Sequence, residues 1–255
     1  MPERLSAWKL ASLYASTMPL NKENEDHDEY PKIKESEDYF EICFRKFLPS
    51  LDDLPILMTY LVFPNGTVRI LLDMEAGKNL PPLPGFGLLF RMEADYDRMA
   101  WYGLGPEENY CDRNMGAKLG VFNGRVADNV EPYLKPQECG NRTGVRWALV
   151  QDKKGRGLIF SVPGWKQGTQ TLTSINSANP LTGETMNFQA IPYSAQMLET
   201  VEHASELPAP RYTFVRVSLT QMGVGGDDSW GARPLPEYIP TAERPIHFEV
   251  EFRQL

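Results

Sequence analysis

The chain has 255 residues, of which 42% are hydrophobic and 24% charged, as expected for one large globular domain or two small ones. Its net charge is −8 and it contains no run of Lys or Arg, so nucleic acid and anionic membrane surfaces are poor partners. No apolar stretch approaches the roughly 20 residues that a membrane helix needs, and the start of the chain does not match a signal peptide.

The three cysteines, Cys43, Cys111 and Cys139, are far apart in the sequence. An odd number without a CxxC pattern argues against a disulfide framework and favours a reducing compartment, so we expect a cytoplasmic protein. The three histidines are also scattered, with no Cys or Asp at ligand spacing. We therefore expect neither a metal site nor a cofactor, and no phosphate loop or dinucleotide motif is present.

The first 38 residues are expected to form an N-terminal helix and an acidic linker. Trp8, Ala11 and Ala15 recur at helical spacing within residues 5–16. Residues 20–38 are polar and acidic, which is typical of an exposed loop or linker. No independent core precedes residue 39, so residues 1–38 are assigned to the same domain as residues 39–255.

From residue 39 onward the hydrophobic period is two, which is typical of β-strands. Asn65-Gly66 between two β-rich runs predicts a hairpin, as does the turn at 152–155. One short helix is expected within residues 194–204, and a polar loop at 171–179. Many short strands separated by turns indicate an all-β sandwich. The predicted strands lie at 40–45, 57–63, 67–73, 87–94, 98–102, 144–151, 156–162, 212–221 and 245–255.

A glycine-rich stretch, MGVGGDDSW at residues 222–230, follows the predicted strand 212–221. Its three glycines, Gly223, Gly225 and Gly226, can adopt backbone angles that a side chain would forbid. The side chains of Asp227, Asp228 and Ser229 can accept hydrogen bonds from nearby backbone N–H groups and so stiffen the turn. The loop would then present Trp230, whose indole suits the apolar face of a sugar ring. The alternative is that Trp230 packs in the core beneath the loop.

This stretch closely resembles the near-terminal motif of family 2 β-galactosidases of the large bacterial type. Two further stretches agree with that family in the same order, WYGLGPEENYCDR at 101–113 and YLKPQECGNRT at 133–143. The resemblance runs from about residue 7 to the end of the chain and concerns the last domain of the family only. At Gly85 the chain departs from a family segment in which an Arg often follows the proline, so an ion pair made by that Arg would be absent.

The resemblance implies a large antiparallel β-supersandwich similar to galactose mutarotases. In the family, this domain begins upstream of the position that matches Met1. We therefore expect the first strands of the sandwich to be missing here, which would leave sheet edges open.

The resemblance also implies a role in lactose hydrolysis by a retaining β-galactosidase. Retaining glycosidases use two carboxyl groups about 5–5.5 Å apart. Glu107-Glu108 and Asp227-Asp228 are adjacent in sequence, so the members of each pair would point to opposite faces of an extended segment. No catalytic residue is therefore predicted, and in the family both catalytic carboxylates lie in an upstream barrel domain.

Trp230 is the predicted substrate-binding residue, since the matching Trp in the family stacks on the leaving-group sugar. The glycines, Asp227, Asp228 and Ser229 are expected to support the loop. The motif at 101–110 is expected to be structural, with Asn109 and Tyr110 bonding across a bend. Ion pairs with a carboxylate are expected for three arginines. Arg113, Arg142 and Arg146 could each pair with Glu107, Glu108 or Glu138.

The expected partners are a catalytic barrel domain or large subunit, a galactoside sugar and further copies in an oligomer. Two other hypotheses stay open at this point. The sandwich could bind a sugar without hydrolysing it, or the chain could be a truncated fragment without activity.

Overall fold

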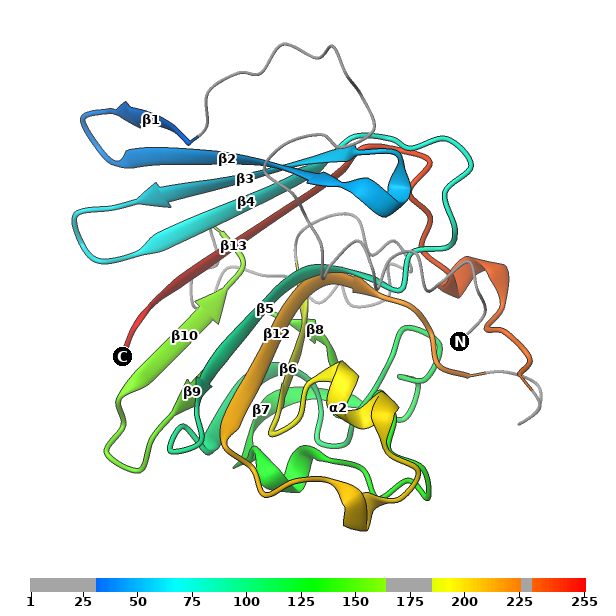
Figure 1. The fold of residues 1–255 in the computed structure, drawn as a ribbon. Helices are drawn as coiled ribbons and strands as arrows, with labels where there is room; N and C mark the ends of the chain where they lie inside the picture. The colour runs from blue at the N-terminus through cyan, green and yellow to red at the C-terminus, as the bar shows by residue number, and fades with distance from the viewer. Residues whose placement is uncertain (1–30, 164–184, 226–230) are drawn as a thin grey trace.

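The computed structural model describes residues 31–163, 185–225 and 231–255. They form two antiparallel sheets, one of nine strands and one of four, which pack against each other (Figure 1). The predicted all-β sandwich is confirmed. The helix predicted at 5–16, the polar loop predicted at 171–179 and most of the predicted linker lie outside the described residues.

The larger sheet consists mainly of sequence-adjacent hairpins. The Asn65-Gly66 turn joins two of its strands as predicted: Gly66 has a φ of 81°, and the Asn65 side chain accepts a hydrogen bond from the N–H of Thr67 at 2.9 Å. In sheet order the strands are β1 (Lys32–Glu35), β2 (Phe40–Leu48), β3 (Leu54–Val62), β4 (Val68–Met74), β13 (Ile246–Gln254), β10 (Gly157–Ser161), β9 (Trp147–Gln151), β6 (Arg98–Gly105) and β7 (Lys118–Arg125).

The smaller sheet brings together segments that are far apart in the sequence. Its central strand β12 (Tyr212–Gln221) pairs over most of its length with β5 (Gly85–Glu93). On its other side β12 pairs with β11 (Met186–Ile191), which in turn pairs with β8 (Arg142–Val145).

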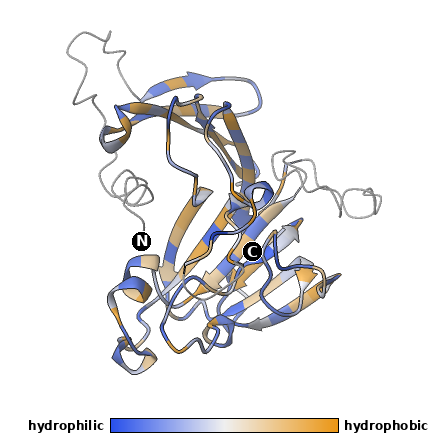
Figure 2. Ribbon diagram, turned by 90° about the vertical axis from the view of Figure 1, so that its right-hand side faces the viewer, coloured by the Kyte–Doolittle hydropathy of each residue, from blue (hydrophilic) through white to orange (hydrophobic). Residues whose placement is uncertain are grey.

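The core lies between the two sheets and follows from the alternation along the strands. Ile70 and Leu72 of β4 lie opposite Val250 and Phe248 of β13, and all four are at most 5% exposed. Burying one such side chain contributes about 1.5–3 kcal/mol. Figure 2 shows the resulting alternation of hydrophobic and hydrophilic bands along the strands.

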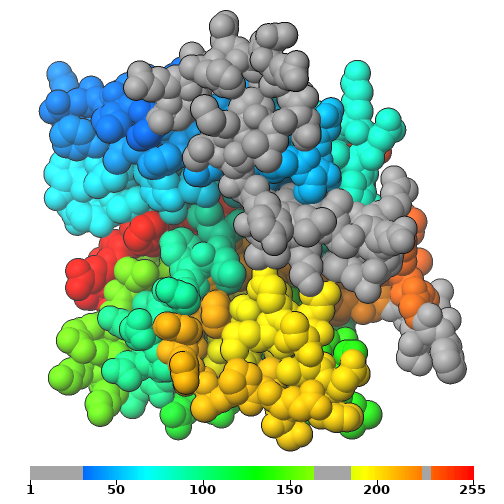
Figure 3. Space-filling model, in the orientation of Figure 1, coloured from blue at the N-terminus to red at the C-terminus, as the bar shows by residue number. Residues whose placement is uncertain are grey.

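One end of the larger sheet extends past the smaller one. Strands β1–β4 form the blue to cyan end of the molecule, away from the yellow region around α2 (Ala195–Thr200) (Figure 3). There the apolar side chains are less covered: Ile33 is 66% exposed and Phe40 is 50% exposed.

The predicted linker was wrong in one part, because residues 32–35 form the edge strand β1. The turn is closed by Ser36, whose N–H and hydroxyl both donate to the carbonyl of Tyr39 at 3.0 and 2.9 Å. Lys34 pairs with Glu41 across the two strands at 3.2 Å. The charged composition concealed this strand, since both of its faces are exposed.

Strands β7 and β11 were not predicted, whereas the short helix at 195–200 was. Ser194 caps that helix by accepting a hydrogen bond from the N–H of Met197. Short 3-10 turns occur at Pro49–Leu51, Ala127–Asn129, Ala204–Glu206 and Pro236–Tyr238. Within the part of the chain that the structure describes, no helix combines the length and hydropathy of a membrane span.

Candidate functional site

The glycine-rich loop begins where β12 ends, and its first four residues are held by three separate segments. The N–H of Met222 donates to the carbonyl of Pro84 at 2.8 Å, and the N–H of Gly223 donates to the carbonyl of Tyr238 at 3.0 Å. The next two N–H groups, those of Val224 and Gly225, donate to the carboxylate of Asp112 at 3.2 and 2.7 Å. Every backbone N–H from 222 to 225 therefore has a partner.

Two of the glycines are needed because the Asp112 carboxylate lies against the loop backbone. A Cβ at Gly223 would lie 2.4 Å from Oδ2 of Asp112, and one at Gly225 would lie 3.1 Å from it. Consecutive N–H groups around a carboxylate form an anion-binding concavity, which here is filled by the protein's own side chain.

Asp112 is fixed by the motif that contains it. Tyr110 and Arg113 form an isolated β-bridge around it, with backbone hydrogen bonds of 3.3 and 2.9 Å. The neighbouring thiol of Cys111 lies 3.6 Å from the carbonyl of Gln221, the last residue of β12. Burial, followed by the charge of Asp112, raises the pKa of Cys111 to about 11, so the thiol stays protonated and can donate.

The motif at 101–113 is in turn hydrogen-bonded to the motif at 133–143. The side-chain oxygen of Asn109 accepts hydrogen bonds from the N–H and hydroxyl of Thr143 at 2.9 and 2.6 Å. The backbone N–H of Asn109 donates to the carbonyl of Asn141 at 2.8 Å, and the side-chain amide of Asn141 donates to the carbonyl of Asn109 at 3.0 Å. All three residues are buried. The structural role predicted for the bend at 101–110 agrees with these contacts.

The ion pairs differ in part from the prediction. Arg113 pairs with Glu108 as expected. Arg142 forms no ion pair within the described residues: it lies over the Trp101 ring at 4.8 Å and donates to the carbonyl of Asn141 at 3.1 Å. The pairing predicted for Arg142 is therefore wrong, because its strand position directs it to the ring rather than to a carboxylate. The guanidinium of Arg146 donates to the carbonyl of Gly144 and lies 5.7 Å from the Tyr102 ring.

The partner of Glu138 is a residue that sequence reasoning missed. Arg216 of β12 donates to the Glu138 carboxylate through both terminal nitrogens, one at 3.0 Å. Gln189 and the hydroxyl of Tyr110 also donate to Glu138, at 3.0 and 3.3 Å. Burial, then the Glu138 charge, raises the pKa of Tyr110, which keeps this hydroxyl protonated. Arg216 lies on the strand that leads into the glycine-rich loop, so this pair ties that strand to the 133–143 motif.

Glu108 is fully engaged in structural contacts. One carboxylate oxygen accepts from Arg113 and from the hydroxyl of Tyr133, and the other accepts from the N–H of Gly140 at 2.6 Å. Glu107 beside it is exposed. A carboxylate occupied in this way is suited to holding loops together rather than to proton transfer.

The remaining predicted site residues, Gly226, Asp227, Asp228, Ser229 and Trp230, lie outside the described residues. Gly85, at the departure from the family segment, is described. A Cβ there would lie 2.8 Å from the side-chain oxygen of Gln221. A larger residue at 85 would therefore press on the end of β12, next to the loop.

The motif at 101–113 thus contacts the base of the loop directly, and the motif at 133–143 contacts both that motif and strand β12, which leads into the loop. The model of the family described as "Beta galactosidase small chain" matches residues 2–252. The chain belongs to the β-galactosidase small-chain family.

Curated relatives of this family member differ greatly in length. A β-galactosidase of Halalkalibacterium halodurans is 37% identical over 228 residues, covering 88% of this chain and 20% of the relative. A β-galactosidase small subunit of Latilactobacillus sakei is 30% identical over 194 residues, covering 76% of this chain and 58% of that subunit. The chain therefore spans about a fifth of the long relatives that it matches.

Among solved structures, the small-chain domain is similar to a galactose mutarotase related enzyme from Lactobacillus acidophilus. The TM-score is 0.35 at 5% sequence identity, with 88% of this chain and 70% of that chain covered.

Proposed function

We propose that this chain is the part of a retaining β-galactosidase that completes the sugar site next to a catalytic barrel domain or large subunit. Its own contribution is Trp230, which stacks on the leaving-group sugar, the glucose of lactose. The catalytic acid and nucleophile come from the partner, so the chain alone does not hydrolyse β-galactosides. The setting is the cytoplasm.

The observation that carries this proposal is the anchored base of the loop. Met222 to Gly225 are bonded to Pro84, Tyr238 and Asp112, and they lie between five and eight positions before Trp230 in the sequence. An aromatic ring contributes to sugar binding only if its position is fixed in advance, because ordering it on binding would cost side-chain and loop entropy. The contacts at 222–225 supply a fixed starting point for that loop.

The contacts of Glu108 and Glu138 fit the same division of labour. Among the carboxylates of the described residues, Glu108 and Glu138 are both held by several donors within the fold. A glycosidase needs one carboxylic acid and one free carboxylate facing each other across the sugar. Those two groups are assigned here to the barrel partner.

The test is to pair the chain with its barrel partner and compare Trp230→Ala with Trp230→Phe. Losing an aromatic platform removes apolar contact of about 1.5–3 kcal/mol. We therefore expect glucose, acting as an acceptor, to bind roughly ten- to hundredfold more weakly to the Ala variant. The Phe variant keeps a ring and should retain most of the affinity.

Lactose hydrolysis should fall more than hydrolysis of an activated aryl galactoside, since cleavage of a good leaving group depends less on the leaving-group subsite. If glucose affinity is unchanged in Trp230→Ala while circular dichroism shows an intact fold, Trp230 is a core residue and the proposal is wrong.

A further inference from the structure

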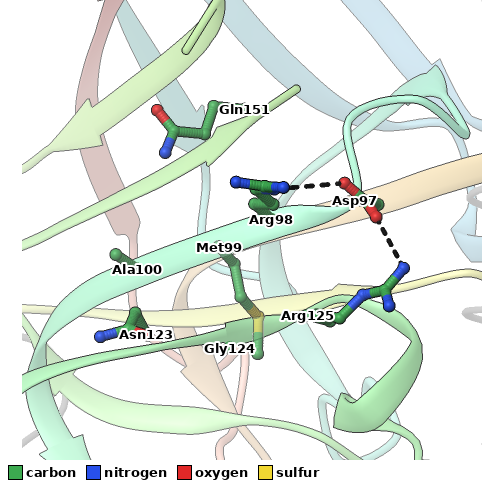
Figure 4. A pocket seen from close by; sticks show the side chains of 8 residues that line it. All are labelled: Asp97, Arg98, Met99, Ala100, Asn123, Gly124, Arg125 and Gln151. Carbon is green, nitrogen blue, oxygen red and sulfur yellow. Dashed lines mark hydrogen bonds and ion pairs between the residues drawn. The ribbon is translucent and has the colours of Figure 1, made fainter. Parts of the chain in front are cut away.

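A cavity with charged and amide side chains in its lining lies away from the glycine-rich loop, on the outer face of the nine-stranded sheet. Its volume is about 510 Å³, and it is formed where β6, β7 and β9 meet (Figure 4). Met99 points into the core and is only 4% exposed. Its neighbours Arg98 and Ala100 therefore point away from the smaller sheet, toward solvent.

Strand register places two guanidinium groups on the same face of this cavity. Arg98 of β6 lies directly opposite Arg125 of β7. Like charges in directly opposed positions repel each other and destabilise a sheet. Asp97 offsets part of this repulsion, at 2.9 Å from Arg125 and 4.0 Å from Arg98 (Figure 4). One carboxylate against two guanidinium groups leaves a net positive charge of about +1, which favours an anion.

Two side-chain amides face the same cavity. Gln151 of β9 lies opposite Arg98, and Asn123 of β7 lies opposite Ala100. Neither amide has a side-chain hydrogen bond to any part of the chain that the structure describes. Each amide offers both donors and an acceptor, which is the combination that neighbouring hydroxyl groups of a sugar require. Ala100 is small and leaves the space between the polar groups open.

We propose that this cavity binds a sugar that carries one negative group, such as a sugar acid or a sugar phosphate. The anionic group lies between Arg98 and Arg125, and the ring hydroxyls bond to Asn123 and Gln151. The volume is within the range of small-molecule sites and holds a monosaccharide. This site uses none of the residues at 222–230, so the result of its test does not depend on the role proposed for Trp230.

The experiment is calorimetric titration of the 255-residue chain with galacturonate, galactose 6-phosphate, galactose and inorganic phosphate. We expect saturable binding of at least one of the two sugar anions, with galactose and phosphate each binding at least tenfold more weakly. Which sugar anion saturates identifies whether the negative group is a carboxylate or a phosphate.

Variants then assign the binding to this cavity. Arg98→Gln and Arg125→Gln should each weaken binding of the sugar anion at least tenfold. Their side chains are 56% and 66% exposed, so both proteins should fold, which circular dichroism checks. Asn123→Ala and Gln151→Ala should weaken binding of the sugar anion while leaving that of phosphate unchanged. The matched control is Arg253→Gln, an exposed arginine on the same face of β13 outside the cavity.

Three results would overturn the proposal. The first is the absence of saturable binding by either sugar anion. The second is phosphate binding as tightly as the sugar anions, which would make the site a plain anion site. The third is an equal loss in Arg253→Gln, which would mean that the overall positive charge of the face is responsible.

Discussion

The contact between Asp112 and the two glycines predicts a strongly non-additive pair of substitutions. In Gly223→Ala the new Cβ would lie 2.4 Å from Oδ2, 2.6 Å from Cγ and 3.0 Å from Oδ1 of Asp112. All three nearest atoms belong to that one carboxylate. Forcing it away should cost about 1–3 kcal/mol of overpacking, together with part of its hydrogen bonding to the loop.

Asp112→Ala removes these atoms and thereby the obstacle. It also removes two charge-assisted hydrogen bonds, so alone it should destabilise by about 1–3 kcal/mol, toward the lower end because the loop is exposed. In that background Gly223→Ala should be neutral or stabilising by roughly 0.4–1 kcal/mol, because it restricts the unfolded chain. The coupling energy of the double-mutant cycle should therefore be about 1–4 kcal/mol.

Urea unfolding of the four proteins measures the cycle, and hydrogen exchange at residues 224 and 225 reports on the loop itself. Gly225→Ala, with a contact of 3.1 Å, should be milder than Gly223→Ala. Gly116→Ala is the matched control, since a Cβ there meets nothing within 4 Å. An equal penalty for Gly223→Ala with and without the Asp112 carboxylate would refute the reasoning.

Two further predictions concern charged pairs. Glu138→Gln should destabilise the protein by about 3 kcal/mol, because it leaves the largely buried Arg216 without its carboxylate partner. The control Glu107→Gln, at an exposed position, should change stability by at most about 0.5 kcal/mol. Thermal unfolding of both variants measures the difference. Burial lowers the pKa of His247, but hydrogen bonds from the ring to Asp73 and Glu249 outweigh it and raise that pKa above its ordinary value. The stability contributed by protonated His247 is fully present below about pH 6.5 and is lost as pH rises through the raised pKa. The unfolding midpoint of the protein should therefore fall as pH rises over that window. The unfolding midpoint of His247→Asn should not. A pH profile that the substitution leaves unchanged would remove His247 from the explanation.

The sequence by itself determined the local structure and the family. Hairpins such as the one at Asn65-Gly66 depend only on residues within a few positions of the turn. The alternation of apolar and polar residues along β4 and β13 indicates directly which face of each strand is buried. The three motifs identified the family because each is long and they occur in order. Where these local signals were weak, strands were missed. Strand β7 contains two glycines. Strand β11 is buried on both faces, so its sequence shows no alternation.

Only the tertiary structure decided how the motifs work together. Asp112 and Gly225 are 113 positions apart, and Glu138 and Arg216 are 78 apart. No periodicity or propensity relates such positions, because their contact exists only once two sheets have packed and loops from different strands meet. The same holds for Arg98, Asn123, Arg125 and Gln151, which strand register alone brings onto one face. A glycine in a motif can be read as flexible from sequence, but only the fold shows that Gly223 is there to make room for a carboxylate.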